Sequence, residues 1–157
     1  MAVIADPEGA VFGIWQPGSF SGAELVNEPG SLSWNELNTR DPEAAESFYG
    51  DLFGWSFAEM DMGESGSYTT MHLPGAAEDD QGIAGLLDMR GRVPDEVPPH
   101  WTTYFTIADL DASLEAAKGA GGNVMFGPLE LPMGRLALIS DPQGVTFGLW
   151  QTLMSSE

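Results

Sequence analysis

The apolar residues of this chain follow two spacings, and the spacings recur in the same order in two halves of the sequence. From Asp41 to Gly54, and again from Asp109 to Gly121, apolar residues lie three and four positions apart, which is typical of one buried helix face. Asp before the first helical residue, Pro42 at the first helical position and Gly at the ends are typical helix boundaries. One helix is therefore predicted in each half.

Each predicted helix is preceded by one apolar stretch of strand length and followed by three more, all separated by turn residues. The stretches cover residues 31–40, 55–62, 67–73 and 82–89, and then residues 100–108, 123–132, 134–140 and 145–151. The predicted fold class is therefore α+β, with two β-α-β-β-β units over residues 31–89 and 98–152. Residues 17–30 are predicted to be a linker and residues 153–157 a tail.

The beginning of the chain repeats its end. Residues 2–16 and 137–151 are identical at nine of fifteen positions when offset by 135, and both have the form strand, Asp-Pro-x-Gly turn, strand. The identical pairs are Ala2/Ala137, Ile4/Ile139, Asp6/Asp141, Pro7/Pro142, Gly9/Gly144, Phe12/Phe147, Gly13/Gly148, Trp15/Trp150 and Gln16/Gln151. Residues 1–16 are thus predicted to be a hairpin equivalent to the last two strands of a preceding module.

This hairpin is either a relic of a truncated upstream module or a structural element in use. A free two-stranded hairpin is marginal in water, and its apolar residues would form an exposed patch with open strand edges. We therefore expect it to be paired and buried, most simply against a second subunit, although its own module's sheet edge is an alternative. A two-fold homodimer is the default assembly.

Composition narrows the classes of partner. The 157 residues include 24 acidic and 5 basic residues, for a formal charge of −19, and no cysteine. Nucleic acid and anionic membranes are excluded as expected partners because phosphate binding needs clustered Lys and Arg. The sequence has neither a stretch of transmembrane length nor a recognisable signal peptide, so a cytoplasmic location is the expectation.

Two β-α-β-β-β units with the helix openings TRDPEAAESFYGDLFGW and IADLDASLEAAKGAGG, and the closing segment DPQGVTFGLWQ, resemble the vicinal oxygen chelate superfamily. That superfamily includes glyoxalase I, bleomycin-resistance proteins and extradiol dioxygenases. The resemblance covers residues 31–152, and residues 1–16 resemble the last hairpin of an upstream module in tandem members. It implies a curled, half-open eight-stranded sheet around a cavity, with the helices outside.

In metal-dependent members, the resemblance implies ligands on the first and last strands of each unit. The corresponding positions here are Trp34, Thr102, Gly148 and one residue in the strand from Gly85 to Asp88. The first three are poor ligands for a divalent ion, which needs three or more N, O or S donors from the protein. The two histidines, His72 and His100, are interpreted as surface or packing residues, so neither a metal nor another cofactor is expected.

Strand alternation assigns the faces of the predicted sheet. Residues Leu37, Thr39, Phe105, Ile107, Phe147 and Leu149 are expected on the helix side. The candidate ligand-binding residues, expected on the cavity side, are Trp34, Asn38, Thr102, Tyr104, Thr106 and Trp150. Rigid aromatic side chains with a few polar groups are typical of a small-molecule pocket, and ordinary core packing is the alternative.

Glu36 is the candidate catalytic residue. A carboxylate facing a partly apolar cavity is costly unless it is paired, solvated or protonated, so it is a candidate general acid or base. The alternatives are a register that places it in solvent, or an ion pair with Arg40 or Arg135.

Three functions remain open. The first is a metal-free protein that binds a hydrophobic or aromatic small molecule. The second is a lyase, isomerase or dioxygenase-like enzyme of the same superfamily that uses Glu36. The third is a non-catalytic module whose cavity is filled by its own side chains.

Overall fold

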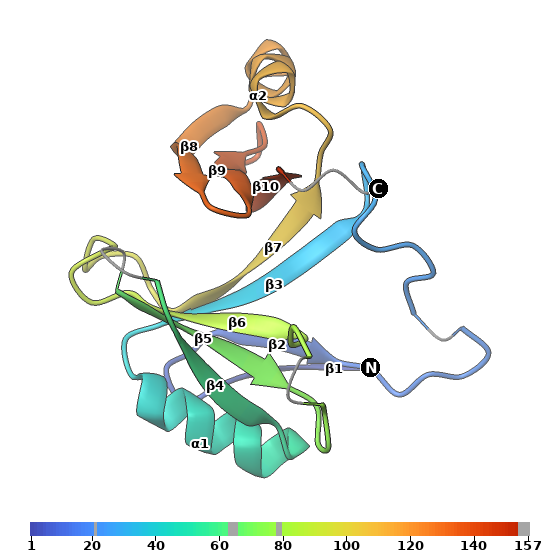
Figure 1. Cartoon of the computed structure of the whole chain (residues 1–157), viewed down its shortest axis with the longest axis vertical. Helices are drawn as coiled ribbons and strands as arrows, with labels where there is room; N and C mark the ends of the chain where they lie inside the picture. The colour runs from blue at the N-terminus through green and yellow to red at the C-terminus, as the bar shows by residue number, and fades with distance from the viewer. Residues whose placement is uncertain (21, 63–65, 78–79, 154–157) are drawn as a thin grey trace. The chain divides into compact units, whose positions relative to one another are not determined.

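The computed structural model describes residues 1–20, 22–62, 66–77 and 80–153, and its elements follow the predicted order (Figure 1). The strands are β1 (Ala2–Ala5), β2 (Val11–Ile14), β3 (Leu32–Thr39), β4 (Ser56–Asp61), β5 (Ser67–His72), β6 (Ala84–Asp88), β7 (His100–Thr106), β8 (Asn123–Leu131), β9 (Gly134–Ser140) and β10 (Thr146–Thr152). The helices are α1 (Pro42–Phe53) and α2 (Leu110–Gly119). Residues 154–157 of the predicted tail lie outside the described residues.

Both helices begin where the sequence predicts. The Asp41 carboxylate accepts a hydrogen bond from the Ala44 amide at 3.1 Å, and Asp109 accepts one from Ala112 at 3.0 Å, so each satisfies an amide of the first turn. The helix α1 ends at Gly54, whose φ of 70° is a left-handed conformation that favours glycine.

The fold is α+β, as predicted, with eight strands of the described residues in one mixed sheet of order β4-β5-β6-β3-β7-β10-β9-β8. The pairs β3–β6 and β7–β10 are parallel, whereas β4–β5, β5–β6, β8–β9 and β9–β10 are antiparallel. The chain forms two compact units, which we call the α1 unit (described parts of residues 1–21 and 35–101) and the α2 unit (described parts of residues 22–34 and 102–157).

The core of the α1 unit lies between α1 and its strands. Leu37, Tyr49 and Met71 are fully buried and form one cluster with Ala45 and Leu86. The predicted orientation of Leu37 toward the helix is confirmed.

The core of the α2 unit is aliphatic. Leu110 and Leu114 of α2 pack with Ile139 and Leu149, and Phe147 lies against this cluster. The predicted helix side of β10 is therefore confirmed as well.

The hairpin β1–β2 forms a separate two-stranded sheet, so the alternative that it extends an edge of its own module's sheet does not hold in this chain. One of its faces packs against α1 of the same chain: Ala10 is fully buried, and the Phe12 ring lies 5.3 Å from the Tyr49 ring. The Tyr49 hydroxyl also donates a hydrogen bond to the Asp6 carboxylate at 3.1 Å. The aromatic side chains of α1 supply the apolar surface on which the hairpin packs.

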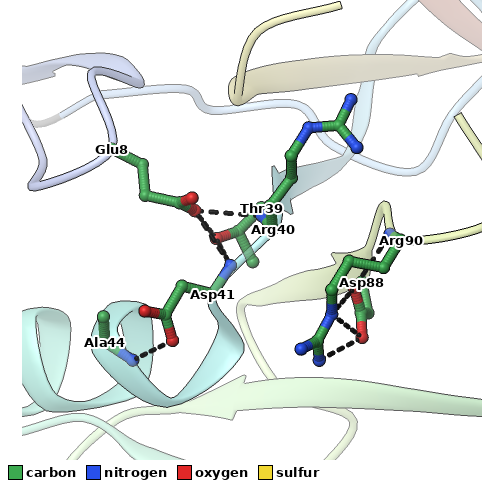
Figure 2. Close-up of polar contacts among 7 residues, drawn as sticks. All are labelled: Glu8, Thr39, Arg40, Asp41, Ala44, Asp88 and Arg90. Carbon is green, nitrogen blue, oxygen red and sulfur yellow. Dashed lines mark hydrogen bonds and ion pairs between the residues drawn. The ribbon is translucent and has the colours of Figure 1, made fainter. Parts of the chain in front are cut away.

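Glu8, at the tip of the hairpin turn, contacts the junction between β3 and α1 (Figure 2). Its Oε2 atom accepts hydrogen bonds from the Thr39 hydroxyl and from the amides of Arg40 (3.0 Å) and Asp41 (3.1 Å). A carboxylate is favourable there because it lies beside the amino end of a helix. The expected second subunit at the hairpin stays a prediction. Among the described residues, neither α1 nor α2 has the length and apolar character of a membrane-spanning helix.

Candidate functional site

The α2 unit carries an aromatic face built on glycine. Gly148 on β10 is paired in register with Tyr104 on β7, and a Cβ atom placed on Gly148 would lie 2.0 Å from the Tyr104 ring. The ring therefore lies directly over the glycine backbone. Tyr104 is 7% exposed, so this contact fills the position at which the resemblance implies a metal ligand on the last strand.

Trp150 lies on the same face, because its register partner on β7 is Thr106, two residues beyond Tyr104. Its indole ring covers Gly134 at the start of β9, where a Cβ atom would lie 2.5 Å from it. The predicted sharing of one face by Tyr104, Thr106 and Trp150 thus follows from the observed register.

The hydroxyl of Thr106 is buried and has no hydrogen-bond partner among the described residues. The Thr106 backbone, in contrast, is fully used, since its amide donates to the Ser31 carbonyl and its carbonyl accepts from the Gly30 amide. Buried hydroxyl groups in proteins nearly always have a partner. This hydroxyl therefore has capacity for one polar atom.

The α1 unit holds Glu36, with a partner that the sequence did not reveal. The Tyr68 hydroxyl on β5 donates a hydrogen bond to Glu36 Oε2 at 3.0 Å. Gly85 on β6 is paired with Glu36, and a Cβ atom on it would lie 1.7 Å from the Tyr68 hydroxyl. A glycine inside a strand is a signal of such a close approach, and at Gly85 it could have been read from the sequence.

The other predicted residues are placed as follows. Asn38 is buried in the α1 unit, and its side-chain amide donates to the Glu36 carbonyl at 3.4 Å. Thr102 is buried on β7, and Trp34 is half-buried on β3. The two arginines considered as partners of Glu36 bind other groups: Arg40 contacts Pro94, Asp95 and Val97, while Arg135 contacts Asp111 and Glu130.

The residues at the implied metal-ligand positions do not fit a divalent ion. Gly85 on β6 is paired with Glu36 on β3, just as Gly148 on β10 is paired with Tyr104 on β7, so Gly85 is the counterpart of Gly148. The four implied ligand positions therefore hold Trp34, Gly85, Thr102 and Gly148. Tyrosine rings occupy the space over both glycines. Among the described residues, no three His, Asp or Glu side chains lie close enough together to hold a metal ion.

The two histidines bind within the protein. His72 Nε2 lies 2.8 Å from the Thr70 hydroxyl and its Nδ1 lies 3.3 Å from Asp80, whereas His100 Nδ1 lies 2.8 Å from the Pro98 carbonyl. An open hollow occurs away from these residues, at the β4–β5 hairpin, where it is lined by Glu59, Asp61, Gly66 and Ser67.

Comparison with known proteins gives relatives of about twice this length. The chain is 40% identical over 152 residues to a protein named "Putative glyoxylase CFP32" from Mycobacterium tuberculosis, and the match covers 95% of this chain and 54% of the relative. It is 37% identical over 150 residues to the anthracycline biosynthesis protein DauV of Streptomyces sp. (strain C5), covering 95% and 51%. The chain therefore spans about half the length of the curated relatives it matches.

Solved structures support the fold. A methylmalonyl-CoA epimerase from Mycobacterium tuberculosis matches with a TM-score of 0.53 at 20% identity, covering 78% of this chain and 88% of the other. A variant of the Streptomyces coelicolor epimerase matches with a TM-score of 0.56 at 16% identity, covering 83% and 99%. At these identities the likeness concerns the fold alone. Residues 31–149 match the sequence profile of one family over most of the chain, and the chain therefore belongs to the Glyoxalase/Bleomycin resistance protein/Dioxygenase superfamily.

Proposed function

We propose that this chain binds a flat, hydrophobic or aromatic small molecule without a transition metal. The observation that carries the proposal is the face of the α2 unit on which the Tyr104 and Trp150 rings lie over Gly148 and Gly134. Rings held against glycine backbone have fixed orientations, which suits them to stack on another flat ring.

Two further observations support a ligand of this type. The unpartnered hydroxyl of Thr106, in register with Trp150, offers one hydrogen bond to a polar atom, as a hydroxylated or carbonyl-bearing aromatic compound has. The relatives DauV and DnrV are named for anthracycline biosynthesis, and anthracyclines are polycyclic aromatic compounds with such groups. The proposed site includes Trp34 and Thr102, which belong to the same unit.

A ligand screen by thermal shift tests this function. A panel of planar aromatics, including an anthraquinone and an anthracycline, is expected to raise the melting temperature, with affinity then measured by quenching of tryptophan fluorescence. Replacing Trp34 or Trp150 by Ala should weaken binding by about tenfold or more, which corresponds to about 1.4 kcal/mol.

Phe105→Ala is the matched control, because Phe105 follows Tyr104 on β7 and its ring packs on Phe147, on the helix side of the strand. This variant should lose stability and keep ligand affinity. Equal losses of affinity in Phe105→Ala and Trp150→Ala, or no stabilisation by any aromatic compound, would remove the support for the proposal.

The second candidate is an enzyme of this superfamily that uses Glu36 as an acid or base. It is favoured by the hydrogen bond from Tyr68, which holds one carboxylate oxygen in place. Turnover of methylglyoxal with glutathione, measured with and without added Ni²⁺ or Zn²⁺, tests the activity for which CFP32 is named. Activity that is lost in Glu36→Gln and reduced in Tyr68→Phe would favour the enzyme over the binding protein.

A further inference from the structure

The hairpin β1–β2 buries only one of its two faces. The pairs Ile4–Phe12 and Val3–Gly13 are successive in its register, so their side chains lie on opposite faces. Phe12 packs against α1, whereas Val3 and Val11 on the other face are 65% and 60% exposed. Trp15, which directly follows β2, is 55% exposed, and its ring contacts only the Phe20 ring among the aromatic contacts of the described residues. The strands β1 and β2 themselves contain no charged residue to protect this face or their open edges.

The repeated copy of this hairpin in the α2 unit has strands paired along both of its outer edges. There, β10 is paired in parallel with β7 on one side and with β9 on the other, and β9 is paired with β8. In β1–β2, both outer edges are unpaired within the described part of the chain, because the small sheet contains these two strands alone. The repeat therefore predicts that the hairpin would pair with strands equivalent to β7 and β8.

Gly13 indicates what lies over the open face. Its repeat partner Gly148 is required by the Tyr104 ring, which leaves no room for a side chain. At Gly13, a Cβ atom would meet only the Ala2 carbonyl oxygen at 3.9 Å, and its φ is not positive. Glycine weakens a strand interior, so the contacts of this chain give no reason for glycine there.

The geometry points to a docking surface for a partner β-α-β-β-β module that lacks its own closing hairpin. In the partner module, a strand equivalent to β7 pairs in parallel with the open edge of β2 and places a tyrosine ring over Gly13. A strand equivalent to β8 pairs with β1. Trp15 then takes the position that Trp150 has in the α2 unit, so the hairpin completes a second aromatic face. The lengths of the curated relatives leave room for such a module, since this chain covers 54% and 51% of two of them.

A second copy of this chain is a poorer occupant. Its β7 is already paired with its own β10, and its hairpin contains no tyrosine to place over Gly13. Two hairpins joined edge to edge would leave Gly13 as unexplained as it is in the single chain.

The test adds the missing strand to the full chain. A copy of residues 100–108, HWTTYFTIA, is joined to Met1 through about eight Gly and Ser residues. An added strand parallel to β2 would end beside Ile14, which lies opposite Ala2 on β1. The linker from the end of the added strand to Met1 then crosses two strand spacings, about 10 Å in total. Tethering gives an effective concentration in the millimolar range, which detects weak pairing.

Hydrogen exchange of single amides, followed by NMR, is the readout. We expect the β2 amides that face away from β1 to exchange at least tenfold more slowly in the extended chain. The slowing should vanish in two matched variants: one with Ser in place of the tyrosine of the added strand, and one with Gly13→Val. No slowing, or slowing that persists in both variants, overturns the proposal.

Two measurements on the chain without the extension test it independently. Gly13→Ala should leave the melting temperature unchanged or higher, whereas Gly148→Ala should lower it. A fall in melting temperature with Gly13→Ala would show that the chain itself needs this glycine, and would overturn the proposal. Concentration-dependent dimerisation that protects the β2 amides would assign the face to a second copy and overturn it as well.

Discussion

Two glycines in the strands lie where a tyrosine side chain packs closely against the sheet. Gly85 and Gly148 occupy equivalent positions beside the first strand of each unit, and each is covered by a tyrosine. The two tyrosines differ in register: Tyr104 is the direct partner of Gly148, whereas Tyr68 lies two residues from Thr70, the partner of Gly85 on β5. The two contacts therefore differ in how much they can relax.

Gly148→Ala should destabilise the protein by about 1–3 kcal/mol, the usual cost of overpacking a buried site. The new methyl group would meet the ring near its attachment point, Cγ at 2.6 Å, so the ring cannot swing away. Gly85→Ala should cost less, because there the nearest atom is the tip of the Tyr68 side chain. Urea denaturation of both variants measures the difference. A loss for Gly85→Ala as large as for Gly148→Ala would show that the Tyr68–Glu36 contact is equally rigid.

Tyr49 links the hairpin, α1 and Trp101 through one hydroxyl group. Its hydroxyl donates to Asp6 and accepts a hydrogen bond from Trp101 Nε1 at 3.0 Å. Burial raises the pKa of the Tyr49 phenol far above its ordinary value, and the Asp6 carboxylate raises it further, while the bond from Trp101 acts in the opposite direction. The folded protein therefore holds this phenol neutral.

This raised pKa predicts a loss of stability in alkali. In the unfolded chain Tyr49 ionises near pH 10, whereas in the folded chain it stays neutral, so its contribution is full below about pH 10 and falls as the pH rises further. Urea denaturation from pH 8 to 11 should show a steeper decline for the wild type than for Tyr49→Phe. Parallel declines would contradict the raised pKa of Tyr49.

Tyr49→Phe should also be less stable at pH 8, because it leaves Asp6 and Trp101 without this hydrogen-bond partner.

At the scale of elements, the hairpin turn and the start of α1 form one polar junction. Asp6 and Asp141 fold the two repeated turns identically, since each carboxylate accepts two amides of its own turn. One difference between the turns is that Glu8 reaches the β3–α1 junction, whereas its repeat counterpart Gln143 is exposed. Glu8 therefore helps to adapt a repeated turn to dock on α1.

Glu8→Gln should destabilise the protein by about 1–2 kcal/mol, because three hydrogen bonds to a carboxylate become bonds to a neutral amide. The matched control Gln143→Glu changes the same turn position in the other repeat and should leave stability unchanged. Thermal unfolding of both variants checks this. Equal melting temperatures for wild type and Glu8→Gln would show that the apolar contacts of Phe12 alone hold the hairpin.

At the scale of the whole molecule, a formal charge of −19 repels itself. Most of the five basic residues form ion pairs with neighbouring carboxylates. The Arg135 guanidinium, for example, lies 3.0 Å from Asp111 and 2.6 Å from Glu130. Its guanidinium holds the pKa of the Asp111 carboxyl below the usual range. Most of the acidic side chains have no such neighbour to offset them, because basic residues are so few.

Screening of this charge predicts that NaCl stabilises the fold. Raising the salt concentration from about 0.02 to about 1 M shortens the Debye length to about 3 Å, so the melting temperature should rise by several degrees.

Stoichiometric Zn²⁺, Mn²⁺ or Ni²⁺ should not raise the melting temperature further, and elemental analysis of protein purified without chelator should find well under one equivalent of metal. Stoichiometric metal that is lost in Glu36→Gln would refute this prediction.

Local sequence signals were sufficient to predict the elements and their order. Helix starts at Asp41 and Asp109, the strand stretches and the hairpin turns depend on neighbours within a few residues, and local chemistry is enough to set them. Strand alternation also placed Leu37, Phe147 and Leu149 on the helix side, because side chains in a strand alternate strictly. The family resemblance agreed with the profile match over residues 31–149.

Contacts between residues on different strands could not be predicted in this way. The contact of Tyr68 with Glu36 and Gly85 requires the registers of β3, β5 and β6, which are set by the packing of segments 32 and 49 residues apart in the chain. The docking of the hairpin on α1 likewise joins Asp6 to Tyr49 and Glu8 to Asp41. Such long-range contacts depend on how whole apolar faces fit together, and no local pattern encodes that fit.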